Sequence, residues 1–189
     1  SAKGYDICGK TIVNILNKYK KWKALVMGDE PREKLFFDHK NLKIYGNVKH
    51  DKVLNLLKKV SISVVCSRWE EPFGRTSLEA SANGCAVIIT NKGGLPETVT
   101  DAKILQELNE ENLTKSISNL IDNKKLRDNL QKKSIKNFYL THKFVSSNID
   151  SYRDEKFKYL RLFNVKKNAS LRILHVTNFN ERHDGRLFF

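Results

Sequence analysis

Two glutamates, Glu71 and Glu79, lie on either side of a Pro-Phe-Gly turn with seven residues between them. Glu71 precedes the turn, and the helical pattern that follows places Glu79 about one turn into a helix. Carboxylates accept strong hydrogen bonds from paired hydroxyl groups, so the two side chains could hold a sugar ring and a ribose. Two glutamates at this spacing are also common by chance in a chain with 21 acidic residues, so the spacing alone does not define a site.

The turn between the two glutamates is suited to a diphosphate. Pro72 fixes one backbone dihedral, and Gly74 permits a tight turn with close approach of a ligand. The backbone amides of Gly74, Arg75 and Thr76 have no partner inside the helix that they open. Free amides and the helix dipole together favour an anionic group at this position.

Short apolar runs alternate with amphipathic segments, and these are the elements that must position the turn. Ligands bind at the carboxyl ends of the strands in an open parallel sheet, and residues 67–74 directly follow the strand expected at 62–66. Continuous apolar strands separated by helices predict an α/β fold, a Rossmann-like parallel sheet with helices on both faces. We expect Asp51 to be the N-cap of one helix and Gly84 to close another. The pattern predicts strands at 24–27, 42–45, 62–66 and 86–89, and helices at 10–19, 51–59, 76–83, 110–121, 126–139 and 144–159.

The pattern changes near the end of the chain and predicts three parts. Residues 1–160 form the first domain, residues 161–170 are a linker, and residues 171–189 are the first strand and loop of a further, truncated domain. The chain is expected to be a piece of a longer protein.

The net charge of +14 favours anionic partners such as phosphates and anionic lipid headgroups. The lysines are spread along helical patterns, so a solvated basic surface is the simpler interpretation. A basic nucleic-acid-binding module remains an alternative, but only the charge supports it. The three cysteines have no metal-like pairing and are expected to be reduced thiols of a cytoplasmic protein. His50 and His142 have no metal-like companions and are expected at the surface.

Three stretches together resemble a known family. They are Ser67 through Ala80, Ala82 through Ile88, and Gly93-Gly-Leu-Pro-Glu97. They resemble the C-terminal domain of retaining glycosyltransferases of family four, which carries two glutamates flanking seven residues with Pro-Phe-Gly after the first. The resemblance covers about residues 1–159. It implies the C-terminal half of a GT-B fold and transfer of a sugar from a nucleotide-diphosphate-sugar to an acceptor hydroxyl, with retention and with neither a metal nor a cofactor.

The resemblance implies roles at matching positions. Lys3 and Glu71 would be catalytic, because Lys3 would offset the charge of the leaving diphosphate and Glu71 would bind hydroxyls of the donor sugar. Glu79 would bind the ribose. Arg68 could reach the base or the phosphate, or be merely exposed. The implied donor-binding set also includes the glycine turn at Gly28, the nucleobase loop at Val48, and the backbone of Phe73, Gly74, Arg75 and Thr76.

Two departures from the family pattern stand out. Arg75 occupies a position that is usually aliphatic, and residues 98–106 contain none of the glycines usual before the last strand. A nucleotide-sugar epimerase or a phosphorylase on the same scaffold remains an alternative. The expected partners are a nucleotide-sugar, a sugar or lipid-linked acceptor and an N-terminal domain outside this chain, with peripheral contact at the inner face of a membrane left open. The segment 171–179 resembles the opening strand of a second glycosyltransferase, and the alternative is that it is a strand of the first enzyme's own domain outside this chain.

Overall fold

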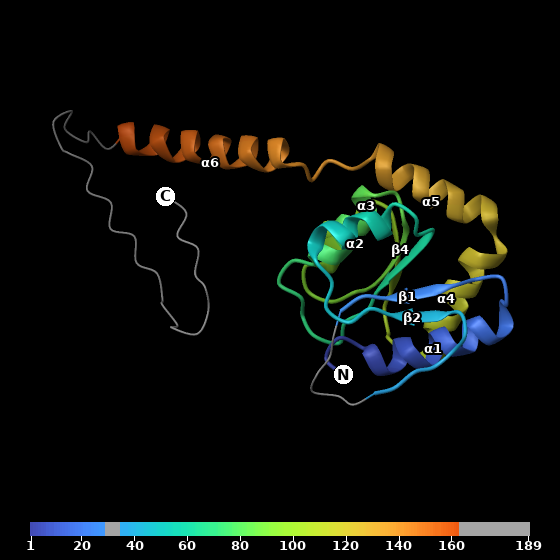
Figure 1. The fold of residues 1–189 in the computed structure, drawn as a ribbon. Coiled ribbons are helices and arrows are strands. Elements are labelled where there is room, and N and C mark those ends of the chain that lie inside the picture. The colour runs from blue at the N-terminus through green and yellow to red at the C-terminus, as the bar shows by residue number, and fades with distance from the viewer. Residues whose placement is uncertain (29–34, 163–189) are drawn as a thin grey trace. The chain divides into compact units, whose positions relative to one another are not determined.

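The computed structural model describes residues 1–28 and 35–162 (Figure 1). The chain separates into a compact unit, Ser1–Phe144, and a second unit that begins at Val145. The predicted strand and loop at 171–189 lie outside the described residues, as does most of the predicted linker. Its first two residues belong to the last helix, α6 (His142–Leu162).

The strands of the first unit form two parallel sheets among the described residues. β1 pairs with β2, and β3, β4 and β5 pair in that order. The expected parallel α/β fold is confirmed, but β1 and β3 do not pair with each other, so one continuous ladder is not present. The strands are β1 (Ala24–Val26), β2 (Leu42–Ile44), β3 (Ile62–Val65), β4 (Ala86–Thr90) and β5 (Ala102–Leu105).

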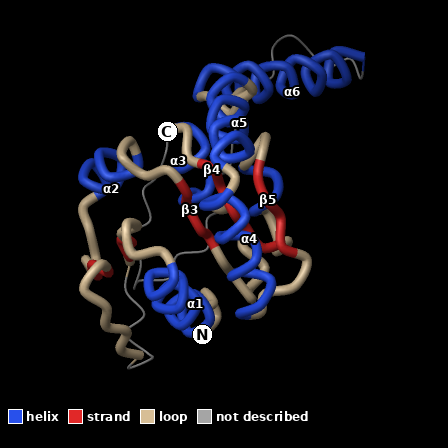
Figure 2. Tube along the Cα trace, turned by 90° about the vertical axis from the view of Figure 1, so that its right-hand side faces the viewer, coloured by secondary structure: helices blue, strands red, loops and turns tan. Residues whose placement is uncertain are grey.

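Helices cover both faces of the sheet that contains β4, as expected, and Figure 2 shows that sheet between them. β4 is buried along its whole length, and its alternate side chains enter two cores. Ala86 and Ile88 pack with residues of α1 and α4, whereas Val87 and Ile89 pack with Leu57 of α2 and with residues near α3. The helices of this unit are α1 (Tyr5–Lys18), α2 (His50–Leu57), α3 (Arg75–Ala82), the short 3-10 helix η1 (Leu95–Thr98), α4 (Glu110–Asp122) and α5 (Lys124–Lys136).

The predicted start of the first helix and the predicted N-cap of the second were wrong. α1 begins at Tyr5 rather than at residue 10, because Gly4 in the left-handed region (φ 65°) ends the preceding turn. α2 begins at His50 with Lys49 as its N-cap, so Asp51 lies inside the first turn and does not cap the helix. An acidic residue is favourable in either place, since both face the positive end of the helix dipole.

The glycine-free stretch 98–106 contains β5, a strand that the apolar pattern did not predict. Lys103 interrupts the run, and Lys103 and Ile104 are both exposed because β5 pairs with β4 on one side only. Edge strands tolerate such charged residues. Within the described residues, no helix combines the length and the apolar character that crossing a bilayer requires.

Candidate functional site

Most of the predicted site residues lie in loops at the carboxyl ends of the parallel strands, and the others lie on α3 or in the N-terminal turn. Gly28 follows β1, Val48 follows β2, and residues 66–74 follow β3. The first two loops meet directly, because the Gly28 amide donates a hydrogen bond to the carbonyl of Gly46 at 2.8 Å. Because parallel strands end at the same edge of a sheet, loops that are far apart in the sequence come together there.

The start of the chain is attached to the loop after β3. The amide of Arg68 donates to the carbonyl of Ala2 at 2.8 Å, and the amide of Ser67 donates to the Thr90 hydroxyl at 2.9 Å. The first bond holds the N-terminal turn beside the loop, and the second ties the loop to the end of β4. Lys3 is thereby carried to the Pro-Phe-Gly turn.

Lys3 and Glu71 form an ion pair in which the ammonium nitrogen contacts Glu71 Oε1. The Glu71 side chain is 15% exposed, whereas that of Lys3 is 58% exposed. The carboxylate is thus held in the loop, and the lysine is the partner that solvent reaches. The two residues expected to be catalytic are therefore in contact with each other.

The Gly93-Gly94 turn packs against the backbone that carries Glu71. The Gly94 amide donates to the Glu71 carbonyl at 2.6 Å, and the Gly93 amide donates to the Glu70 carboxylate at 2.6 Å. A Cβ on Gly93 would lie 2.3 Å from the Glu71 carbonyl oxygen, so only glycine fits this close approach. The ammonium of Lys92 and then the Gly93 amide lower the pKa of the Glu70 carboxyl.

The first turn of α3 is joined to η1 through side-chain hydroxyls, and the helix N-terminus carries no side-chain cap. Gly74, with φ 97°, precedes the helix, and no described side chain bonds its first amides. The Ser77 hydroxyl donates to the Gly74 carbonyl at 2.7 Å and lies 2.7 Å from the buried Thr98 hydroxyl, which donates to the Leu95 carbonyl. The helix start is therefore fixed to η1, and the amides of Arg75 and Thr76 have no intrahelical partner.

Glu79 lies on α3 and contacts two basic side chains. His50 Nε2 is 2.9 Å from Glu79 Oε1, and Arg75 Nε is 3.5 Å from the same oxygen. Arg75 is 73% exposed and points along its own helix toward Glu79. Sequence reasoning treated His50 as an ordinary surface residue. Its position two residues after Val48, in the loop expected to receive a nucleobase, was the signal that could have identified it.

Arg68 is directed to α1. Its guanidinium donates to both carboxylate oxygens of Asp6 at 2.8 Å and to the carbonyl of Ser1 at 2.8 Å. The Arg68 guanidinium lowers the pKa of Asp6 to about 2. Arg68 fixes the loop to the start of α1, and its donor-binding role stays a prediction.

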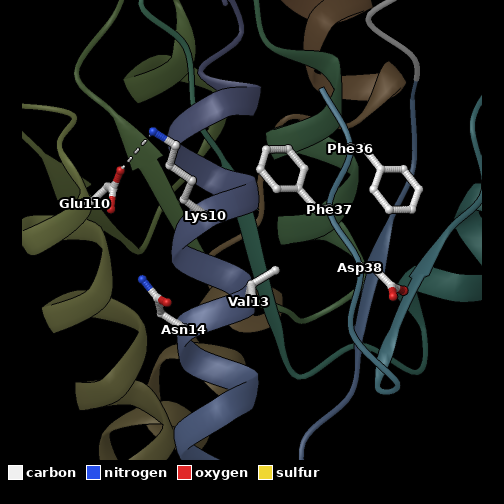
Figure 3. Close-up of a pocket in the computed structure, with 7 residues that line it drawn as sticks. All are labelled: Lys10, Val13, Asn14, Phe36, Phe37, Asp38 and Glu110. Atoms are coloured by element: carbon white, nitrogen blue, oxygen red, sulfur yellow. Dashed lines mark ion pairs between the residues drawn. The ribbon is translucent and has the colours of Figure 1, made fainter. Parts of the chain in front are cut away.

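The surface hollow shown in Figure 3 is lined by none of these residues. It has a volume of about 340 Å³ and lies between α1 and residues 36–38. Phe37 covers Gly9 and makes an edge contact with Tyr5, with ring centroids 5.4 Å apart, whereas Phe36 is 84% exposed. Lys10 turns toward Glu110 at 3.7 Å. The hollow therefore contains none of the predicted site residues.

The described residues hold neither a metal-binding cluster nor a disulfide. No three His, Cys, Asp or Glu side chains lie together in a way that could hold a metal ion in this part of the chain. Cys66 and Cys85 are buried and Cys8 is half-buried, all as free thiols, and burial raises the pKa of Cys85 to about 11. The chemistry at the strand ends therefore consists of carboxylates, basic side chains and backbone amides.

Comparison with known proteins gives consistent matches. The family model described as glycosyl transferases group 1 matches residues 1–137. An uncharacterized glycosyltransferase of Methanocaldococcus jannaschii is 38% identical over 93 residues, which are 48% of this chain and 26% of that protein. Spore coat protein SA of Bacillus subtilis is 31% identical over 91 residues, and the chain spans about a quarter of the length of these two relatives.

A solved structure resembles the fold over most of its length. The C-terminal domain of a glycosyl transferase group 1 family protein, LpcC of Francisella tularensis, aligns with a TM-score of 0.63 and 26% identity over 71% of this chain and 77% of that one.

Proposed function

Because the chain belongs to the group 1 glycosyl transferases, we propose that its strand-end loops bind the nucleotide-diphosphate-sugar donor of a glycosyl transfer to an acceptor hydroxyl. One observation carries the proposal: an uncapped helix start, at Arg75 and Thr76, lies between two carboxylates that are each held by a basic side chain from another element. Anion-binding amides between two hydroxyl-binding carboxylates match the parts of a nucleotide-sugar in order.

In this proposal the donor extends across α3. Glu79 accepts hydrogen bonds from the ribose hydroxyls, the amides from Phe73 to Thr76 bind the diphosphate, and Glu71 accepts from hydroxyls of the sugar. Val48 meets the nucleobase through its backbone, and Gly28 shapes the neighbouring turn. Arg68 supports the site by fixing the loop to α1.

The chemical step needs stabilisation of the leaving group. The bond between the anomeric carbon and the diphosphate oxygen breaks, a bond to the acceptor oxygen forms, and the proton of the acceptor hydroxyl passes to the departing diphosphate. Negative charge develops on the departing diphosphate, where the amides of α3 and a cation are most effective. Lys3 supplies that cation by exchanging its Glu71 partner for a phosphate oxygen, which releases Glu71 to the sugar.

Several finer features belong to the same proposal. We propose retention of the anomeric configuration, a place in the assembly of a polysaccharide, lipopolysaccharide or glycolipid, and action in the cytoplasm beside the inner face of a membrane. No metal or cofactor takes part. The acceptor site belongs to an N-terminal domain, so residues 1–160 alone would bind the donor and transfer little or nothing, and efficient transfer by them would refute this division.

Nucleotide binding can be tested with a thermal-shift panel. UDP, GDP, ADP and CDP and their common sugar conjugates would be compared at concentrations from micromolar to millimolar. A ligand at about 100 times its Kd stabilises the native state by about 2.7 kcal/mol, which raises the melting temperature by several degrees. The proposal predicts such a rise for one nucleoside diphosphate and its sugar conjugates, and no rise with any of them would contradict it.

A solved structure of similar fold contains a nucleotide-sugar. Anabaena HepE, in complex with UDP-glucose, aligns with this chain at a TM-score of 0.57 over 79% of this chain and 46% of that one. At 18% identity the likeness concerns the fold alone. Product analysis of the whole protein with a labelled nucleotide-sugar distinguishes transfer from epimerisation: label on an acceptor supports the proposal, and label retained on a nucleotide-linked epimer contradicts it.

A further inference from the structure

Both contacts to the Glu79 carboxylate go to the same oxygen. His50 Nε2 lies 2.9 Å from Oε1, and Arg75 Nε lies 3.5 Å from it. No described residue hydrogen-bonds to Oε2. The carboxylate thus has one oxygen that is held and one that is available to a ligand.

The two contacts differ in how firmly they hold the carboxylate. Arg75 is 73% exposed, and 3.5 Å is long for a hydrogen bond, so this contact is a loose ion pair. His50 is within hydrogen-bonding distance and is the first residue of α2, directly after the extended N-cap Lys49. Its backbone is therefore set by the start of a helix, and its ring has only two side-chain torsions.

The helices that carry the pair are fixed to each other. Leu57 of α2 and Ala80 of α3 are buried in the same core, where Val53 packs against them. The last torsion of a glutamate side chain is broad, so a carboxylate on a fixed helix still rotates unless something bonds it. The hydrogen bond from His50 removes that freedom at one oxygen.

We propose that His50 is a positioning residue for ribose recognition. It holds Oε1 of Glu79 so that Oε2 accepts hydrogen bonds from the ribose hydroxyls, and it couples the loop after β2 to the carboxylate on α3. This inference rests on the proposed function, because it assigns a task to the same donor site. His50 touches no reacting atom, so its effect is on affinity for the ribose and not on the transfer step.

Loss of the His50 side chain should reduce the preference of the site for ribose over 2′-deoxyribose. A site built to bond a hydroxyl discriminates against the analogue that lacks it, because its polar group is then left without a partner. The chain should therefore prefer a ribonucleoside diphosphate over its 2′-deoxy analogue by about tenfold, the ratio that corresponds to one hydrogen bond to a charged group. Removing His50 should reduce that preference rather than weaken both ligands equally.

The test measures dissociation constants by calorimetric titration for four forms of the chain: wild type, His50→Ala, His50→Gln and Asp51→Asn. The ligands are the ribonucleoside diphosphate that stabilises the wild type in the panel and its 2′-deoxy analogue. Glutamine can donate from its Nε2 at a similar reach. Asp51→Asn perturbs the same first turn of α2, and no described hydrogen bond or ion pair joins Asp51 to Glu79. Circular dichroism melting establishes that each form is folded.

We expect His50→Ala to lower the ribose preference to about two- to threefold, His50→Gln to restore most of it, and Asp51→Asn to leave it unchanged. If His50→Ala weakened the binding of both ligands equally, His50 would be a structural residue only. If His50→Ala changed neither dissociation constant, the positioning role of His50 would be excluded as well. Failure of the wild type to bind any nucleoside diphosphate would instead overturn the proposed function itself.

Discussion

At the residue scale, the two glutamates are held differently. Glu71 contacts a flexible lysine, whereas Glu79 contacts the ring of a histidine at a helix start. An ion pair with an exposed lysine contributes little stability and exchanges partners easily. We therefore expect Glu71 to change its partner when a donor binds and Glu79 to keep its orientation.

Substitution of each glutamate should affect a different part of the donor. Glu79→Ala should weaken nucleoside diphosphate binding about ten- to a hundredfold, the range for hydrogen bonds to a charged group. Glu71→Ala should leave that binding nearly intact and abolish the additional affinity that the sugar provides. Thermal-shift titrations with the nucleoside diphosphate and its sugar conjugate measure both effects.

The matched control is Glu107→Ala, which removes an exposed glutamate outside the site. It should change neither titration. If Glu79→Ala behaved like Glu107→Ala, the assignment of Glu79 to the ribose would be wrong.

The pair of Asp6 and Arg68 should make stability depend on pH in the acid range. The folded pKa of Asp6, about 2, lies below the ordinary value of 3.8, so the pair stabilises the fold above pH 4 and loses its effect as pH falls through 2. Solvent reaches this pair, and we expect Asp6→Asn to cost about 1 kcal/mol at pH 7. Urea unfolding of both proteins between pH 7 and pH 2 should show the two stabilities converging. A difference that stayed constant down to pH 2 would contradict this account.

At the element scale, the position of Glu71 depends on the contact between two loops. Gly93→Ala should destabilise the protein by about 2–4 kcal/mol, because the new Cβ would lie 2.3 Å from the Glu71 carbonyl oxygen and 2.5 Å from its amide nitrogen. Backbone atoms cannot move aside as a flexible side chain could. Donor binding should weaken as well, since the loop that carries Glu71 would shift.

Gly46→Ala is the matched control for that substitution. Gly46 has φ 62° and Gly93 has φ 51°, so both alanines would be strained in the left-handed region. Nothing lies within 4 Å of a Cβ at Gly46, and only the backbone strain of about 1 kcal/mol should remain. Chemical unfolding compares the two directly. Equal losses would show that the close approach at Gly93 contributes nothing.

The fold was largely predictable because its elements are marked by local patterns. The apolar runs at 24–27 and 86–89 and the Gly84 stop are all local signals, and the structure confirms each of them. β5 was not predictable in this way, because the burial of an edge strand depends on its one neighbour. The loop position of His50 placed it near the site, but its contact with Glu79 was not predictable, since that contact arises only when α2 and α3 pack together.

At the scale of the whole molecule, the charge of +14 bears on where the protein acts. A basic surface is attracted to anionic lipid within about a Debye length, so the attraction must weaken as salt rises. If the proposed membrane contact is right, the protein should float with vesicles that contain phosphatidylglycerol at low salt and be released by added sodium chloride. Neutral phosphatidylcholine vesicles are the control. Absence of flotation with either lipid would remove the membrane from the proposal.

The central claim is that the strand-end loops, and not another surface, hold the donor. Backbone amide NMR during titration with the nucleoside diphosphate tests it most directly, because each amide reports its own surroundings. We predict the largest shift changes at Phe73, Arg75, Thr76 and Val48. Changes centred instead on the hollow beside Phe36 and Phe37, or no changes at saturating ligand, would contradict the account.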